Sequence, residues 1–74
     1  MTAKEMFEAL GYELDSTYEI DGHLFWCKDY RKIDFDLKRK DFYKYTSGGF
    51  RSPIDMDLLK AINQQCKEFG WLDE

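Results

Sequence analysis

The fold is decided by residues 23–46, which read HLFWCKDYRKIDFDLKRKDFYKYT. Residues 23–28 are apolar on both sides, which is typical of a central strand, and residues 33–37 alternate apolar residues with aspartate, which is typical of a half-buried strand. A basic stretch, Lys38-Arg39-Lys40, then leads into a further strand at residues 42–46. Because only a few residues separate these segments, we expect the strands to be antiparallel neighbours.

Another strand is predicted in front of this stretch. Residues 12–20 alternate with a period of two between a largely apolar set, which includes Tyr12 and Leu14, and an acidic or hydroxylated set. Asp21-Gly22 follows, and both residues tolerate the positive φ of a tight hairpin turn. The sequence therefore predicts a four-stranded antiparallel meander.

A helix is predicted at the start of the chain. Thr2 and Glu5 have the spacing of a capping box, in which each side chain bonds a free backbone N–H of the other residue. An apolar stripe follows as far as Gly11, a residue suited to the positive φ at a helix end. We expect a helix from Thr2 to Leu10.

A second helix is predicted at the end of the chain, with Asp55 as its N-cap and Gly70 as its end. Its apolar face consists of Ile54, Leu58, Leu59, Ile62, Cys66 and Phe69. In a glycine cap the residue after the glycine packs back on the helix, so we expect Trp71 against Cys66 and, at the first helix, Tyr12 against Phe7.

Together these elements predict an α+β fold of order α-β-β-β-β-α, in one domain spanning residues 1–74, with both helices packed on the sheet. Aromatic residues make up 18% of the chain, so ring-rich packing is expected to stabilise this small domain in place of disulfides or a metal. The predicted core brings Met6, Phe7, Leu10, Leu58, Ile62 and Phe69 against Leu14, Phe25, Phe35 and Leu37.

The strand registers decide which side chains share a face. A three-residue loop at residues 30–32 would place Cys27 opposite Phe35, Phe25 opposite Leu37, and Lys28 across from Asp34.

The last hairpin allows two registers. A two-residue turn at Arg39-Lys40 pairs Leu37 with Phe42 and leaves Tyr43 and Tyr45 on the outer face. A three-residue loop pairs Leu37 with Tyr43 and exposes Phe42. In both cases we expect Trp26 and some of these aromatic residues on the face opposite the core.

Charge is unevenly distributed along the chain. The net charge is −4, but residues 28–51 hold eight basic residues against four aspartates, a local charge of +4 between two acidic ends. No apolar run approaches the ~20 residues of a membrane span. The first residues lack the apolar core of a secretory signal, and two cysteines are too few for a disulfide framework. We expect a cytoplasmic protein with no membrane contact.

Several segments carry a resemblance to a known group of proteins. They are residues 7–13 (FEALGYE), residues 58–62 (LLKAI) with the later Gly70-Trp71, and residues 33–36 followed by 42–44. Together they resemble short, uncharacterised proteins of phages and prophages of Gram-positive bacteria. That group has no assigned activity, cofactor or catalytic residue, so the resemblance implies the cytoplasm of a bacterial host cell and little else.

Three groups of residues are candidates for chemistry. Asp36-Leu37-Lys38 fits the acidic-x-Lys element of metal-dependent nucleases, with Asp34 on the same side of the strand, but a third carboxylate from Asp15 or Asp29 would be needed. The element is short and common, and alternating aspartates are typical of a solvated strand face. Cys27 and Cys66 lie in apolar patterns and are expected to be unreactive, while His23 is expected at the rim beside the turn. We therefore predict no catalytic, cofactor or metal site.

Two functions are compatible with this pattern. The favoured hypothesis is a non-enzymatic accessory or interaction protein that uses an aromatic sheet face formed by Trp26, Tyr43 and Tyr45. Its partner is an unidentified protein or a second copy of the chain, giving a homodimer. The alternative is a small nucleic-acid-binding protein whose hairpin tip, Lys38-Arg39-Lys40, contacts phosphates together with Lys44, near stacking tyrosines.

Overall fold

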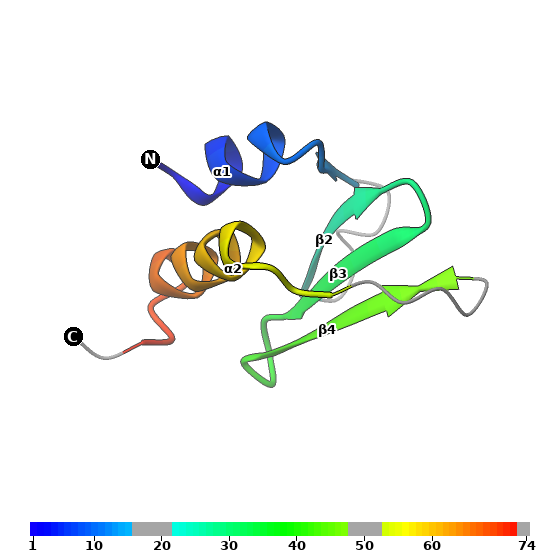
Figure 1. Ribbon diagram of the computed structural model, residues 1–74. Helices are drawn as coiled ribbons and strands as arrows, with labels where there is room; N and C mark the ends of the chain where they lie inside the picture. The colour runs from blue at the N-terminus through cyan, green and yellow to red at the C-terminus, as the bar shows by residue number, and fades with distance from the viewer. Residues whose placement is uncertain (16–21, 48–52, 73–74) are drawn as a thin grey trace. The chain divides into compact units, whose positions relative to one another are not determined.

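A computed structural model describes residues 1–15, 22–47 and 53–72 of the chain. Its elements are α1 (Ala3–Ala9), β1 (Glu13–Leu14), β2 (His23–Lys28), β3 (Arg31–Asp36), β4 (Asp41–Thr46) and α2 (Met56–Glu68), as Figure 1 shows. This order confirms the predicted α-β-β-β-β-α arrangement. Among the described residues, neither helix is long and apolar enough to cross a membrane.

The chain forms two compact units. The first, Met1–Gly11 with Pro53–Glu74, contains both helices, and we call it the helical unit. The second, Tyr12–Ser52, contains the four strands, and we call it the sheet unit. The helical unit therefore joins the first and last parts of the chain, and the sheet unit is made from the middle.

Both helices begin at the predicted caps. The Thr2 hydroxyl accepts a hydrogen bond from the Glu5 N–H at 3.2 Å, and the Glu5 carboxylate accepts one from the Thr2 N–H at 2.9 Å. At α2, the Asp55 carboxylate accepts from the Leu58 N–H at 2.8 Å. These bonds satisfy backbone donors that the first helical turn leaves free, so the predicted helix starts are confirmed.

The end of α2 also follows the prediction. Gly70 has a φ of +76°. Its N–H donates to the Lys67 carbonyl at 3.0 Å, and the Trp71 N–H donates to the Cys66 carbonyl at 3.0 Å. The backbone of Trp71 therefore turns back onto Cys66, as expected of a glycine cap. The ring of Trp71 packs on Phe69, with 4.8 Å between ring centroids.

One contact between the two helices was not anticipated. The Glu68 carboxylate near the end of α2 accepts a hydrogen bond from the Ala3 N–H in the first turn of α1 at 2.7 Å. A second donor, the Gln64 side-chain amide, lies 3.0 Å from the same oxygen. The buried residues of this unit are Ala3, Phe7, Leu58, Ala61, Ile62, Gln65 and Cys66. Ile54 and Leu59, which were assigned to the apolar face, are 42% and 46% exposed, so their assignment was wrong.

The sheet is antiparallel with the strand order β1-β2-β3-β4. The predicted turn between β2 and β3 was wrong, because Lys28 pairs with Arg31 and the loop consists of only Asp29 and Tyr30. Asp29 adopts a φ of +52°, which lets the chain reverse within two residues.

The register of β2 on β3 differs accordingly. Phe25 lies opposite Asp34, not Leu37, and Cys27 lies opposite Lys32, not Phe35. Lys28 lies across from Arg31 rather than Asp34. A shift by an odd number of residues moves a side chain to the other face of the sheet. Phe25 and Phe35 are therefore on opposite faces.

Neither predicted register of the last hairpin is observed. Asp36 pairs with Asp41 and Phe35 with Phe42, so residues 37–40 form a four-residue turn. The Asp36 carboxylate accepts hydrogen bonds from the N–H groups of Lys38 and Arg39 at 3.0 and 3.1 Å. This bonding and the φ of +59° at Lys40 shape the longer turn.

The sheet has one buried face. Trp26, Ile33 and Phe35 lie on it in adjacent strands and are 2%, 0% and 0% exposed. The expectation that Trp26 lies on the outer face was therefore wrong. Leu14 and Leu37, which were predicted in the core, are 39% and 38% exposed. Strand β1 is short, and residues 16–20 of the predicted strand lie outside the described residues, as does Asp21 of the predicted turn. Gly22, the second residue of that turn, has a φ of +76°.

Candidate interaction site

The side of the sheet opposite the buried face, which we call the outer face, is a grid of three rows across three strands. The register places its nine residues as follows: His23, Asp36 and Asp41 in the first row, Phe25, Asp34 and Tyr43 in the second, and Cys27, Lys32 and Tyr45 in the third. Glu13 of β1 extends the third row beyond Cys27. Eight of these nine side chains are aromatic, imidazole or charged, and the charged ones are three aspartates and one lysine, so this face has the composition of a recognition surface.

Asp34 occupies the centre of the grid and is only 7% exposed. Its carboxylate lies 2.8 Å from Nδ1 of His23, which is one strand away and diagonal to it. A buried carboxylate needs such a partner, because an unpaired charge is costly to remove from water. The pair orders the middle of the outer face.

The ring of Phe25 contacts two polar side chains, His23 and Lys32. The His23 ring stacks on it, with 5.8 Å between centroids and 13° between planes. Nζ of Lys32 lies 5.1 Å from the Phe25 centroid, within the range of a cation–π contact. These contacts order the side chain of Phe25 on the part of the outer face that β2 provides.

Tyr43 and Tyr45 form the opposite side of the grid, on the edge strand β4. They are 46% and 50% exposed, and their ring centroids are 6.3 Å apart. The Tyr43 hydroxyl lies 3.5 Å from the Asp41 carboxylate, at the limit of a hydrogen bond. Two large rings thus stand side by side with about half of each accessible.

Charge changes along the outer face. The first row carries Asp36 and Asp41, the second carries Asp34, and the third carries Lys32. Bonds from the backbone N–H groups of Arg39 and Lys38, opposed by partial burial, lower the pKa of Asp36, and the nearby His23 and Arg39 side chains lower it further. Asp36 is therefore ionised at neutral pH, and the face is most acidic beside the β3–β4 turn.

The third row borders a hollow of about 270 Å³ at the β2–β3 turn. It is lined by Cys27, Asp29, Tyr30, Arg31, Lys32 and Ser47. Burial, and then the charge of Asp15, raise the pKa of the Cys27 thiol, whose sulfur lies 3.8 Å from the Asp15 carboxylate. Burial likewise raises the pKa of Cys66. Both thiols are protonated at neutral pH and are weak nucleophiles.

The predicted interaction residues are only partly brought together. Tyr43 and Tyr45 are neighbours on the outer face, whereas Trp26 is buried on the other one. Among the predicted phosphate contacts, Lys38, Arg39 and Lys40 are exposed in the turn at residues 37–40.

Lys44 does not join them. It pairs with Ile33 and so lies on the buried face, where burial and then the charge of Arg31 lower its pKa. The basic turn, Lys44 and the two tyrosines therefore do not form one surface.

The aspartates of the predicted nuclease element have structural partners. One oxygen of Asp36 holds the backbone of the β3–β4 turn, and Asp34 is paired with His23. Across residues 1–15, 22–47 and 53–72, no three His, Cys, Asp or Glu side chains are grouped so that they could hold a metal ion. The pairing of His23 with Asp34 was missed because it depends on the β2–β3 register.

Comparison of the chain with protein-family models, with curated proteins and with solved structures finds no match.

Proposed function

We propose that this protein is a non-catalytic interaction module whose outer face binds a cationic segment of another protein. The observation that carries this proposal is the pair of half-exposed rings, Tyr43 and Tyr45, on a face that holds three aspartates against one lysine. Aromatic rings of this kind commonly anchor protein contacts, because they bury much area with few rotatable bonds.

The charges of the outer face favour arginine and lysine in the partner. An arginine side chain lying over Tyr43 would contact the ring face and, at the same time, lie beside Asp41, which is already 3.5 Å from the Tyr43 hydroxyl. A planar guanidinium combines stacking on an aromatic ring with hydrogen bonds to a carboxylate. The cationic end of a partner segment would lie over the first row, away from Lys32.

The position of the tyrosines on an edge strand supports an extended partner. Among the described residues, β4 pairs with β3 on one side and with no strand on the other. An extended segment that bonds to such an edge places alternate side chains on the same face as Tyr43 and Tyr45. Backbone bonds then supply affinity, and the acidic outer face supplies the preference for basic residues.

The same charges disfavour nucleic acid on this face. A base stacked on Tyr43 would bring its phosphates close to Asp41 and Asp34, which repel them. The cations proposed for phosphate contact lie elsewhere, in the turn at residues 37–40 and, for Lys44, on the buried face. We further propose, from the resemblance to phage and prophage proteins, that the module acts as an accessory protein in the cytoplasm of a bacterial host.

The proposal is tested by titrating the labelled protein with a short peptide of alternating arginine and glycine residues, followed by amide NMR. We expect shifts at β3 and β4 that weaken with added salt, because exposed charges are screened. Tyr43→Ser and Tyr45→Ser should each weaken binding by about tenfold or more. Tyr30→Ser is the matched control, since Tyr30 is 39% exposed but lies in the β2–β3 turn, off the outer face.

Two results would overturn this assignment. One is equal binding of the control peptide in which glutamate replaces arginine, because acidic residues on the face should repel it. The other is the absence of peptide shifts together with binding of a single-stranded oligonucleotide that is lost in Lys38→Ala, Arg39→Ala, Lys40→Ala protein. That pattern would assign the function to the basic turn.

A further inference from the structure

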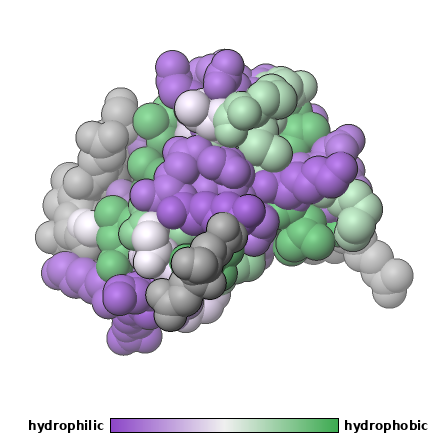
Figure 2. All heavy atoms as spheres, turned by 90° about the vertical axis from the view of Figure 1, so that its left-hand side faces the viewer, coloured by the Kyte–Doolittle hydropathy of each residue, from purple (hydrophilic) through white to green (hydrophobic). Residues whose placement is uncertain are grey.

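The helical unit carries a second apolar surface that the proposed function does not use. On the face drawn in Figure 2, hydrophobic residues reach the surface in separate patches between hydrophilic ones. In the helical unit, two neighbouring hollows contain all three methionines of the chain and share one residue, Lys60. We call the residues lining these two hollows the methionine patch: Met1, Met6, Ala9, Leu10, Met56, Asp57, Leu59, Lys60 and Asn63.

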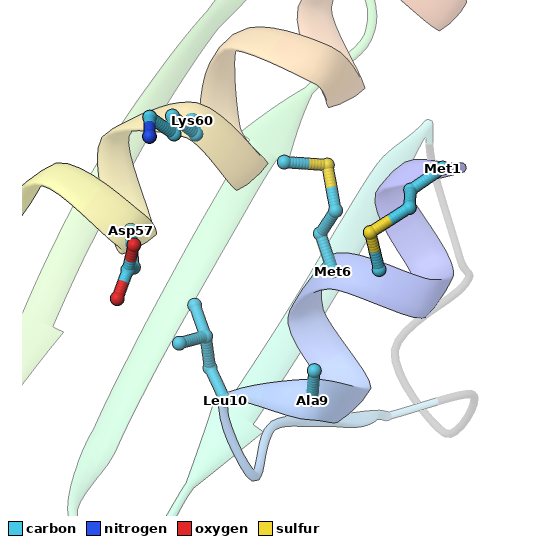
Figure 3. Close-up of a pocket in the computed structure, with 6 residues that line it drawn as sticks. All are labelled: Met1, Met6, Ala9, Leu10, Asp57 and Lys60. Atoms are coloured by element: carbon cyan, nitrogen blue, oxygen red, sulfur yellow. The ribbon is translucent and has the colours of Figure 1, made fainter.

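The first hollow lies between α1 and α2 and has a volume of about 410 Å³. Figure 3 shows Met6 of α1 and Leu10, which caps the end of α1, pointing toward α2, and α2 contributes Asp57 and Lys60 to the rim. The lining from α1 is entirely apolar, and the charges come from α2. A hollow of this kind suits an apolar side chain flanked by charged groups.

The second hollow, of about 330 Å³, lies along α2 itself. Met56, Leu59, Lys60 and Asn63 line it at spacings of three, four and seven residues, so they form one stripe of the helix. This stripe is distinct from the buried one, and its apolar members protrude: Met56 is 64% exposed and Leu59 is 46% exposed. The patch therefore offers protruding apolar side chains next to a hollow that could receive them.

We propose that the methionine patch binds a second copy of the chain through a two-fold axis, with the two α2 helices antiparallel. In a two-fold interface the same patch of both copies meets, so that patch must contain both protruding side chains and hollows that receive them. The methionine patch contains both. Met56 and Leu59 of each copy would enter the hollow lined by Met6 and Leu10 of the other. Methionine suits such a contact, because its flexible side chain adapts to irregular gaps.

The charges of the patch favour a second copy over a basic or acidic partner. Asp57 and Lys60 lie three residues apart on α2, and both border the first hollow. When two antiparallel helices pack about a two-fold axis, residues along one side of the contact line in one copy face residues along the same side in the other copy. Asp57 of one copy would then lie beside Lys60 of the other, and Lys60 beside Asp57, so that the patch complements its own charge.

Sedimentation of the full chain and two charge-reversed variants tests this arrangement. We expect wild-type protein to show a monomer–dimer equilibrium between about 10 µM and about 1 mM. Asp57→Lys and Lys60→Asp should each weaken the dimer by about tenfold or more, because like charges would face each other. An equimolar mixture of the two variants should restore dimers, since the lysines of one chain then face the aspartates of the other.

A neutral variant and a local probe keep the test independent of helix stability. Circular dichroism identifies variants that remain folded, and Leu59→Ser removes a protruding side chain without a change of charge. Methyl NMR of methionine should show concentration-dependent shifts of Met6 and Met56 that disappear in Leu59→Ser protein. Tyr45→Ser is the control on the outer face, and it should leave the dimer unchanged while it weakens peptide binding.

The proposal is overturned if wild-type protein stays monomeric over this range, or if both charge-reversed variants dimerise as tightly as wild type. Failure of the mixed variants to associate would also overturn the two-fold pairing. Loss of the dimer in Tyr45→Ser but not in Leu59→Ser protein would place self-association on the sheet instead.

Discussion

The two faces of the sheet use the same three strands but differ in what they bury. On the buried face, Trp26, Ile33 and Phe35 are almost completely removed from water. On the outer face, the central buried side chain is the carboxylate of Asp34, and the neighbouring Tyr43 and Tyr45 remain about half exposed. Ile33, Asp34 and Phe35 are consecutive, so a single strand supplies hydrophobic stabilisation on one side and an ordered polar surface on the other.

The largest expected difference between the faces is in stability. Phe35→Ala should lower the free energy of unfolding by about 3–5 kcal/mol, because it removes a buried ring and leaves a cavity. Tyr45→Ala on the outer face should change it much less. Urea denaturation followed by circular dichroism measures both. If Phe35→Ala protein does not fold, Phe35→Leu should show a smaller loss of unfolding free energy. Equal losses for the Phe35 and Tyr45 variants would show that the two faces do not differ in their contribution to stability.

The centre of the outer face is expected to contribute an intermediate amount. His23→Ala leaves the buried Asp34 carboxylate without its partner at 2.8 Å, which should cost about 1–3 kcal/mol of unfolding free energy. Asp34→Ala and the double variant complete a cycle that isolates the pair. A coupling free energy of about 0.5 kcal/mol or more is expected for residues in contact. If the unfolding free energies of the two single variants add up to that of the double variant, the interaction between His23 and Asp34 does not contribute to stability.

A pH titration tests the role of Asp36 in the β3–β4 turn. The pKa of Asp36 is lowered in the folded state, so its stabilising contribution is present above the usual aspartate pKa of 3.8 and is lost as the pH falls through the lower folded value. Asp36→Asn keeps an oxygen for the turn but removes the titration. Unfolding free energies measured from pH 7 to acid should therefore fall less steeply for this variant. Asp29→Asn in the other turn is the control, and an unchanged slope in Asp36→Asn would contradict the assignment.

The smallest effect concerns Lys44, which lies beside Ile33 on the buried face of the sheet. Its pKa is lowered mainly by burial, so the unfolded chain binds the proton more tightly and stability should rise with pH as Lys44 loses its charge. Lys44→Met should stabilise the protein slightly at pH 7, by no more than about 0.5 kcal/mol, and remove this dependence. Thermal unfolding at neutral and alkaline pH measures both effects. Destabilisation by Lys44→Met would show that its charge has a favourable role.

The helix ends were predictable because their signals are local. Thr2 and Glu5 bond to each other across three residues, Asp55 caps a donor three residues away, and Gly70 adopts the positive φ that a helix end needs. Each interaction is complete within one turn of chain. A cap can therefore be recognised from its own residues, without knowledge of the rest of the fold.

The strand registers were not predictable by the same reasoning. Both hairpin turns between β2 and β4 place a residue other than glycine at positive φ, Asp29 in one and Lys40 in the other, and Lys40 gives no sequence signal for it. The resulting shift moved Trp26 to the buried face and brought His23 next to Asp34. Of the two registers predicted for the last hairpin, only the one with a two-residue turn placed Tyr43 and Tyr45 on the outer face. Candidate sites on a sheet are therefore less certain from sequence than helix boundaries, because they depend on the lengths of the turns.

The bond between Glu68 and Ala3 spans 65 residues of the chain. By contrast, the hairpins of β2, β3 and β4 join residues that are close in sequence. During synthesis, α1 precedes α2 and cannot meet it until the four strands between them have also been made. We therefore expect the hairpins to form early and the two helices to join last, so that a chain truncated before Glu68 would leave the first helix without its partner.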